Sequence, residues 1–438
     1  MISLHPRPDP FHRCPYCQIL LQVNGWYIPG VRNLAELQCP QCGLEFYGDL
    51  PVGHGLHYPM LLERSTGIVH NAYHVDWFAD ALGDSYARRI NSPIGFSAEN
   101  FRPLCRVVLL NCLDAMYGHC LLKLLNAQYY LDHHPNLDLV VLIPRFLRWM
   151  VPEGVAGIWM VDLPLKRGSE WNDWLAGEIK RQIEPLDKCW LSVALSHPHP
   201  ADYNIERFTR VHPFPVTEWE KRLEKPAITF IWREDRIWKN TRQHRCFQKL
   251  VQPIIRRLGL IDTHINKQQQ QVIMLSQSLR QDFLNLDFAV VGLGCPGGLP
   301  DWINDLRRLE IDQQVEQAWC ERYANSHIVI GVHGSNMLLP SAHAGAVVEL
   351  VPLDRWDNLI QDILRVEEDN RTTLYQHKFL PLDASPAIVA IVVGSLLRYF
   401  PIAMLNFDPR WRDHKILQSD PTLIAKKRRE IVERLTNL

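Results

Sequence analysis

Residues 326–350 read SHIVIGVHGSNMLLPSAHAGAVVEL, in which two β-branched apolar runs flank the turn GVHG at 331–334. We predict buried strands over 328–332 and 346–351, because short β-branched runs bounded by glycine are typical of buried strands. The polar residues after the turn predict a helix start. Pro340 makes this helix short or late, because a proline inside a helix breaks it.

The turn itself predicts a binding site for an anion such as a phosphate. Amides at a helix start and the helix dipole favour negative charge, and glycines such as Gly334 let the ligand approach the backbone. Ser335 or Asn336 can cap the helix or bond a phosphate oxygen. His333 can donate to a pyrophosphate oxygen or carry positive charge beside it. A tight strand–helix turn with a structural histidine is the alternative.

Strand and helix patterns alternate outward from this stretch in two series, separated at Lys225-Pro226. Such alternation predicts βαβ units and therefore parallel sheets. The first series has predicted strands at 106–111, 137–143, 158–161 and 189–195 and a helix at 118–131. The second has predicted strands at 227–232, 287–292, 328–332 and 346–351 and a helix at 315–324. The fold class is therefore α/β with two Rossmann-like halves.

We expect four parts along the chain. They are a zinc ribbon over 1–55, an N-terminal Rossmann-like domain over 56–224, a C-terminal Rossmann-like domain over 225–385, and C-terminal helices over 386–438. The last part contains a charged amphipathic helix pattern from residue 421 to the end.

Two C-x-x-C pairs, Cys14/Cys17 and Cys39/Cys42, predict a structural zinc site. Two such knuckles place four thiolates around one tetrahedral Zn²⁺, and a module this small needs the metal because its core is too small to fold alone. Four thiolates leave no open position, which excludes a catalytic role for this zinc. A pair of redox dithiols is the alternative.

Composition narrows the function classes. Lys plus Arg (47) nearly cancel Asp plus Glu (48), so bulk charge favours neither nucleic acid nor an anionic membrane. No stretch has the roughly 20 apolar residues of a membrane span, and the run AIVAIVVGSLL from Ala387 predicts a buried helix or strand. The N-terminal residues lack the apolar segment of a secretory signal, and the remaining cysteines are scattered. We therefore expect a cytoplasmic protein.

The 326–350 stretch resembles the C-terminal signature of glycosyltransferase family 61, where a G-x-H-G turn follows a helix and an apolar strand, and a V-V-E-L strand follows a small-residue loop. The match runs through 316–317, 324–337 and 345–350. The segments TFIWREDR at 229–236 and YGHCLL at 117–122 resemble two other places in this family, in the same order. Cys120 stands where the family usually has an aromatic residue, and the zinc module is not part of its pattern.

This resemblance implies a GT-B arrangement, in which the second of two facing domains holds a nucleotide-sugar donor. Negative charge develops on the leaving nucleoside diphosphate, and Arg233, Arg236 and the 333–336 turn are suited to stabilise it. Local ion pairs are the alternative role for these arginines. Glu349 is suited to bind ribose hydroxyls at a strand end, or else to pair with Arg355 or a surface lysine. The chain has no D-x-D motif, so we expect no catalytic metal.

Inverting transfer to a hydroxyl needs a base. His119 and Asp114 lie between a first-domain strand and its helix, and we favour His119 because its pKa suits neutral pH. A backbone contact at the helix start is the alternative role for His119.

Two functions follow from these patterns. The first is a glycosyltransferase that moves a sugar from a nucleotide-sugar to a hydroxyl of a glycan or protein. The second is a non-catalytic zinc-ribbon protein whose degenerate transferase body binds a protein or nucleic acid. The segment between the knuckles, residues 18–38, has one Arg and no Lys, which favours a protein partner over nucleic acid.

Overall fold

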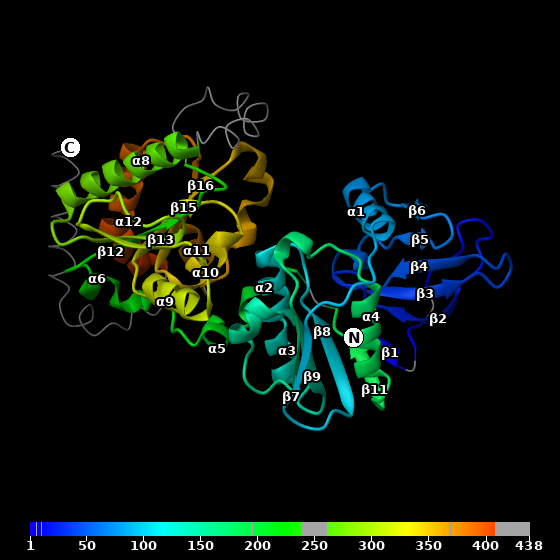
Figure 1. Ribbon diagram of the computed structural model, residues 1–438. Helices are drawn as coiled ribbons and strands as arrows, with labels where there is room; N and C mark the ends of the chain where they lie inside the picture. The colour runs from blue at the N-terminus through cyan, green and yellow to red at the C-terminus, as the bar shows by residue number, and fades with distance from the viewer. Residues whose placement is uncertain (6, 10, 194–195, 239–260, 368–369, 408–438) are drawn as a thin grey trace. The chain divides into compact units, whose positions relative to one another are not determined.

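The computed structural model describes residues 1–407 except 6, 10, 194–195, 239–260 and 368–369 (Figure 1). The chain divides into two compact units, Met1–Arg210 and Val211–Leu438. Both are built on β-sheets with helices, so the predicted α/β class is confirmed. The amphipathic helix predicted from residue 421 lies outside the described residues.

Unit 1 contains a six-stranded sheet whose central four strands are parallel. Its spatial order is β1-β11-β8-β9-β10-β7, and the edge strands β1 and β7 are antiparallel to their neighbours. The central strands therefore follow the order 3-2-1-4 of a Rossmann half. The bounds are β1 Ile2–His5, β7 Phe96–Asn100, β8 Arg106–Asn111, β9 Asp138–Pro144, β10 Gly157–Val161 and β11 Lys188–Leu191.

The helices of this sheet differ in one place from the prediction. The single helix expected over 118–131 is two helices, α2 (Tyr117–Leu125) and α3 (Ala127–His133). The Asn126 side chain donates to the carbonyls of Leu122 and Lys123, and this bonding competes with the helical ladder at the junction. The remaining helices of the unit's second half are α4 (Asp173–Ile183) and α5 (Ile205–Thr209).

The N-terminal part of unit 1 forms a second, antiparallel sheet with α1 (Asp76–Ala87) beside it. It continues past residue 55, because β5 pairs with β4 and β6 pairs with β5. Its buried residues share one hydrophobic core with those of the parallel sheet, as in Phe46 and Trp26 with Val107 and Leu109. The bounds are β2 Gln22–Tyr27, β3 Leu34–Gln38, β4 Glu45–Asp49, β5 Leu61–Glu63 and β6 Val69–His70.

Unit 2 contains one wholly parallel sheet of six strands. Its order is β14-β13-β12-β15-β16-β17, which is the doubly wound order 3-2-1-4-5-6. The bounds are β12 Ala227–Trp232, β13 Asp287–Leu293, β14 Ile303–Arg308, β15 Ile328–Val332, β16 Ala346–Val351 and β17 His377–Pro381. The described helices of the unit are α6 Trp219–Arg222, α8 Ile261–Asp282, α9 Gln313–Ala324, α10 Leu338–His343, α11 Asn370–Gln376 and α12 Pro386–Phe407.

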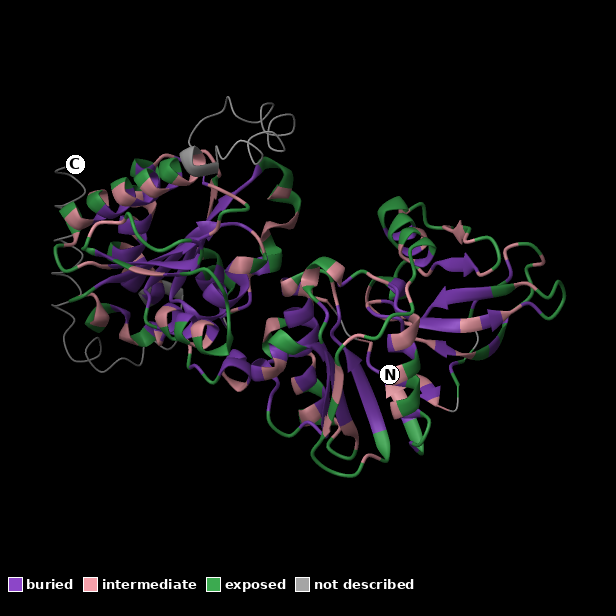
Figure 2. Ribbon diagram, viewed as in Figure 1, coloured by how far each residue is buried: buried purple, intermediate pink, exposed green. Residues whose placement is uncertain are grey.

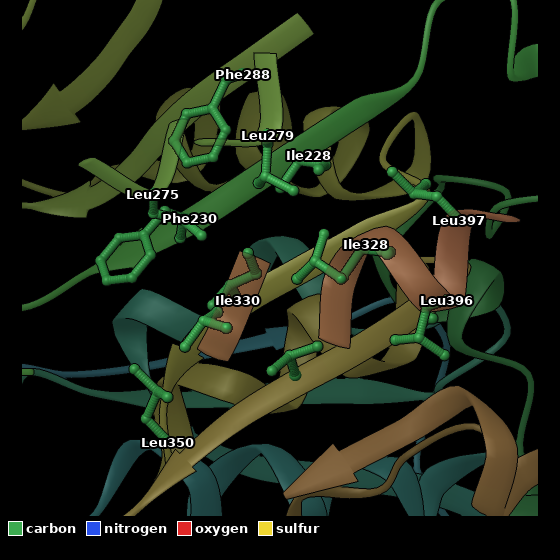
Figure 3. Packing of buried hydrophobic residues seen from close by; sticks show 14 of the residues in the cluster. Ile228, Phe230, Leu275, Leu279, Phe288, Ile328, Ile330, Leu350, Leu396 and Leu397 are labelled. Atoms are coloured by element: carbon green, nitrogen blue, oxygen red, sulfur yellow. The ribbon is translucent and has the colours of Figure 1, made fainter. Parts of the chain in front are cut away.

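The core of unit 2 lies between its sheet and the helices α8 and α12. Leu275 and Leu279 of α8 and Leu396 and Leu397 of α12 pack with alternate residues of the strands, such as Ile228 (Figure 3). The central strands are buried along their whole length, because helix α9 covers the other face (Figure 2). Buried strands of this kind read as continuous apolar runs, which is why the sequence predicts them well.

Helix α6 belongs to the core of unit 2, whereas the domain boundary predicted from the sequence, at residue 225, put it in the first Rossmann-like domain. Trp219 is fully buried, stacks on Phe400 at 4.1 Å and donates from Nε1 to the Leu397 carbonyl. Large aromatic residues contribute strongly to core energy, so this contact explains why unit 2 begins before β12.

Helix α12 is longer than its apolar run suggested. Residues Pro386–Met404 are long and apolar enough to cross a membrane, with a mean hydropathy of 2.0. One stripe of the helix, including Val389, Val393 and Phe400, is fully buried in the unit 2 core. Apolar core helices meet the same criterion, while Ile388 and Ile391, outside this stripe, are exposed.

Candidate functional site

The proposed nucleotide site lies where the strand order of unit 2 reverses. Strands β12 and β15 are neighbours, and the chain continues from them to opposite sides of the sheet. Ligands of open α/β sheets bind at the carboxyl ends of such strands, because the diverging loops leave a crevice. Arg233 directly follows β12 and His333 directly follows β15. The doubly wound order thus brings together two stretches that the sequence singled out separately.

Both predicted arginines contact the 333–336 turn. Arg233 Nη1 donates to Asn336 Oδ1 at 2.6 Å, and Arg236 Nη1 donates to the His333 carbonyl at 3.0 Å. Gly334 has a φ of +142°, and a Cβ at this position would lie 2.9 Å from Arg233 Nη1 and 3.0 Å from Arg236 Nη1. Glycine is therefore required for the backbone conformation and for the close approach of both guanidinium groups.

Positive charge accumulates at this turn. Burial and the nearby charges of Arg233 and Arg355 lower the pKa of Arg236 from its ordinary value, with Asp235 and Asp354 opposing them. Arg233 forms an ion pair with Asp235, which is the alternative role that the sequence suggested for this arginine. Among the described residues, Arg236 has no carboxylate within ion-pair distance. An anion placed here would relieve the mutual repulsion of the guanidinium groups.

The backbone of the turn is only partly available to a ligand. The Gly334 amide donates to Asp362 Oδ2 at 2.9 Å, so it is already used. The amides of Ser335 and Asn336 have no acceptor among the residues that the structure describes, and Ser335 is exposed. A short 3₁₀ turn, Ser335–Met337, precedes α10, which has Pro340 in its first turn. These two amides are the backbone donors that remain for a phosphate oxygen.

His333 is buried beneath the turn, with 3% of its surface exposed. Its Nδ1 lies 2.5 Å from Glu349 Oε2 and 3.1 Å from Asp362 Oδ2. Burial alone would lower the pKa of His333, but the bond with Glu349 and the charge of Asp362 raise it overall. The imidazole is therefore placed to hold the turn in shape between two carboxyl groups.

Glu349 is fully buried on β16 and pairs with His333 instead of the partners that the sequence suggested, Arg355 or a surface lysine. Burial raises the pKa of Glu349 to about 7, although its bond with His333 opposes the shift. Its Oε1 has no partner among the described residues. His333, Glu349 and Asp362 lie close enough to hold a metal ion by distance alone. The 2.5 Å contact of Nδ1 with Oε2 is a hydrogen bond, so His333 and Glu349 share a proton.

This cluster predicts a pH dependence of stability. The folded state keeps Glu349 protonated up to a pKa of about 7, whereas the unfolded carboxyl titrates near 4.5. The folded state then binds more protons, so the free energy of unfolding falls as pH rises through this window. The raised pKa of His333 changes stability in the same direction. The stabilisation that it contributes is present below pH 6.5 and is lost as the pH rises above the folded-state pKa.

Between about pH 5 and about pH 8, Glu349→Gln should reduce the loss in the free energy of unfolding by on the order of 1 to 3 kcal/mol. Urea unfolding followed by tryptophan fluorescence measures the change. Glu321→Gln, on the exposed face of α9, is the matched control and should keep the wild-type slope. Equal slopes in the wild type and Glu349→Gln would contradict the proton-sharing cluster.

The candidate base lies at the corresponding reversal in unit 1, between β8 and β11. His119 Nδ1 lies 3.3 Å from Asp114 Oδ1, and Lys123 Nζ lies 2.8 Å from Asp114 Oδ2. Lys123 also donates to the Leu113 carbonyl, and Asn111 donates to the Gly30 carbonyl. A cavity of about 70 Å³ is lined by Asn111, Asp114, His119 and Lys123 together with His54, Asn33 and Ser196.

The charges around Asp114 bear on its role as one of the two predicted bases. Burial would raise the pKa of Asp114, but the charge of Lys123 and the bonds with His119 hold it well below its usual range. Asp114 therefore stays ionised and does not accept a proton near neutral pH. The contact at 3.3 Å orients the His119 ring against this carboxylate.

Two histidines in this cluster were not predicted as site residues. Burial, followed by the nearby positive charges of His119 and Lys123, lowers the pKa of His54. Burial, followed by His119 and His54, lowers the pKa of His197. His54 comes from the loop after β4 and His197 from the loop after β11, so sequence spacing gave no signal for their proximity.

The four cysteines form a compact group at one end of the N-terminal sheet. Their sulfur atoms lie within 4.8 Å of one another. The Cys17 amide donates to Cys14 Sγ and the Cys42 amide to Cys39 Sγ, each at 3.5 Å. Gln18 and Gly43, which follow the two knuckles, have positive φ angles of 60° and 73°. These features fit a tetrahedral four-thiolate metal site.

The fold and the two strand-order reversals define a two-unit α/β protein with a charged site in each unit. Comparison with known protein families finds no match for this chain, and comparison with curated proteins finds none. Among solved structures, the chain is similar to ADP-heptose LPS heptosyltransferase II from E. coli. The identity is 15% and the TM-score 0.31, over 67% of this chain and 98% of that chain. A likeness this weak assigns neither an activity nor a substrate.

Proposed function

We propose that this protein is a glycosyltransferase that uses a nucleotide-sugar donor. The observation that carries the proposal is the group of arginines over the Gly334 turn, at the strand-order reversal of unit 2. Arg236 and Arg233 bind the diphosphate, and the Ser335 and Asn336 amides donate to its oxygens. Their charge stabilises the leaving nucleoside diphosphate as the bond to the sugar breaks. His333 and Glu349 position the turn from below.

Unit 1 binds the acceptor in this proposal. His119 accepts the proton of the acceptor hydroxyl while that oxygen attacks the anomeric carbon, and the sugar is transferred with inversion. Asp114 stabilises the imidazolium that forms. A GT-B architecture, as implied by the family resemblance, is part of this proposal. The arginines stabilise the negative charge of the leaving diphosphate, which a divalent metal ion does in other transferases. We therefore propose that no catalytic metal takes part.

The four-cysteine site holds Zn²⁺ in a structural role. Four thiolates close the coordination shell, so the ion stabilises the N-terminal sheet and takes no part in transfer. We place the protein in the cytoplasm, where nucleotide-sugars are made and thiols stay reduced. Membership of glycosyltransferase family 61, or of a group related to it, is part of the same proposal.

Nucleotide binding tests the proposal directly. UDP, GDP and ADP at millimolar concentration should each be screened for a rise in melting temperature, and at least one is expected to give it. Arg236→Gln should weaken binding of that nucleotide about 10- to 100-fold, because a charge-assisted bond is lost. Arg308→Gln is the matched control, because Arg308 is the exposed last residue of β14.

Either of two results would remove the donor site. One is the absence of a shift with every nucleotide, and the other is equal affinity in the wild type and Arg236→Gln. A metal-stabilised binding protein would then be the better description of the chain.

A further inference from the structure

A second, larger concavity of unit 1 adjoins the His119 cavity. It has a volume of about 660 Å³ and is lined by residues of the turn before β5 and of the start of α1. His54 lines both concavities, so the two are neighbours. We call the larger one the aromatic basin, defined by His54, His57, Tyr58, His74, Asp76 and Trp77.

The basin exposes aromatic rings that a folded protein normally covers. Trp77 is 60% exposed, the adjacent Tyr73 is 52% exposed and Tyr58 is 37% exposed. The rings are held in place: Tyr58 lies edge-on to Tyr73 with centroids 6.2 Å apart, and Trp77 lies edge-on to His54 at 5.2 Å. Exposed apolar surface that is ordered and rimmed by polar groups marks a binding site.

The backbone of the basin wall is fixed by a strained turn. His74 has a φ of +55°, which residues other than glycine rarely adopt. The Asn71 side chain secures the turn by accepting from the Val75 amide at 3.1 Å and donating to Asp76 Oδ1 at 3.2 Å. Strain of this kind persists where surrounding contacts determine it and is concentrated at functional sites.

The two concavities differ in the size of the group that each can hold. About 70 Å³ around His119 holds roughly two water molecules, which is enough for a hydroxyl group but not for a sugar ring. The basin volume falls within the range of roughly 300 to 1,000 Å³ that is common for small-molecule sites. Of the two concavities, the basin is therefore the one whose volume suits a sugar ring.

We propose that the aromatic basin binds the carbohydrate chain of the acceptor, which makes a glycan the acceptor class. The C–H faces of sugar rings stack on Trp77 and Tyr58, and the hydroxyls bond with His57, His74 and Asp76. This assignment rests on the proposed transferase function for its link to His119, but the basin itself is defined by unit 1 alone. A metal ion does not explain these histidines, because they form no ligand group within reach of one ion among the described residues.

Binding of neutral oligosaccharides to the full-length protein tests the proposal. Cellohexaose, maltohexaose and chitohexaose serve as probes in saturation-transfer NMR and calorimetry. At least one is expected to bind, and Trp77→Ala is expected to weaken it about tenfold, since the aromatic stacking is lost. Phe101→Ala removes another aromatic of unit 1 that is 56% exposed and lies outside the basin, and it should bind as the wild type does.

The result separates this inference from the transferase proposal. Binding that Trp77→Ala weakens supports the basin even if no nucleotide binds to unit 2. If none of the three probes binds, or if Trp77→Ala binds as tightly as Phe101→Ala, the glycan assignment is wrong, and nucleotide binding by unit 2 remains a separate measurement. A thermal melt of each variant checks that unit 1 is folded.

Discussion

Cys39→Ser is expected to release zinc from the protein and to unfold much of unit 1. The side chains of Cys39 and Cys14 are fully buried and belong to the same core as Val107 and Leu109 of the parallel sheet. Structural zinc contributes roughly 10 to 16 kcal/mol of apparent binding energy in small metal-dependent folds. Its loss should therefore lower the melting temperature by roughly 10 °C or more.

Metal analysis and thermal unfolding measure this result together. The wild type should contain about one zinc ion per chain, as four thiolates bind one tetrahedral ion. Cys105→Ser is the matched control, because Cys105 is an exposed thiol of the same unit outside the cluster. A Cys39→Ser protein with unchanged zinc content and unchanged melting temperature would contradict the structural metal site.

His119→Ala is expected to slow sugar transfer by about 10²- to 10⁴-fold, the usual contribution of a general base. Release of nucleoside diphosphate, with the nucleotide-sugar and glycan found by the binding screens, provides the rate. Nucleotide affinity should not change, because the arginines proposed to bind the nucleotide belong to unit 2. Asp114→Asn should also slow transfer, since the amide no longer stabilises the imidazolium.

His133→Ala is the control for this loss of activity. His133 is exposed at the end of α3, and its Nδ1 lies 3.0 Å from the Tyr129 carbonyl. A rate in His119→Ala equal to that in His133→Ala would remove His119 from the mechanism. Loss of both transfer and nucleotide binding in His119→Ala would instead indicate a folding defect.

Much of the fold was predictable where strands are buried on both faces. The apolar runs over β8, β12, β15 and β16 lie within a residue of their predicted bounds, because such strands need apolar side chains throughout. Strand β14, with the sequence INDLRR, was missed because it lies at a sheet edge and carries polar residues. Arg307 in this strand is nevertheless buried, paired with Asp305 and placed over the Trp232 ring.

The candidate sites show the limit of sequence motifs more clearly. The GVHG turn and the two arginines stood out as local patterns, and their proximity follows from the 3-2-1-4-5-6 strand order. Asp362, which bonds the Gly334 amide, comes from a 3₁₀ segment with no motif of its own. The burial of His333 was not readable from the sequence either, since it depends on β16 placing Glu349 beside the ring.

Strand β1 gives unit 1 an order of assembly. Ile2 pairs with Leu191, so β1 gains its partner only after the chain has been made to about residue 191. Pairing across such a sequence distance slows folding, because the entropy of closing the loop is lost before the contact forms. During synthesis, the knuckle cysteines can bind metal well before this last strand docks, so zinc uptake would precede completion of the sheet that carries His119.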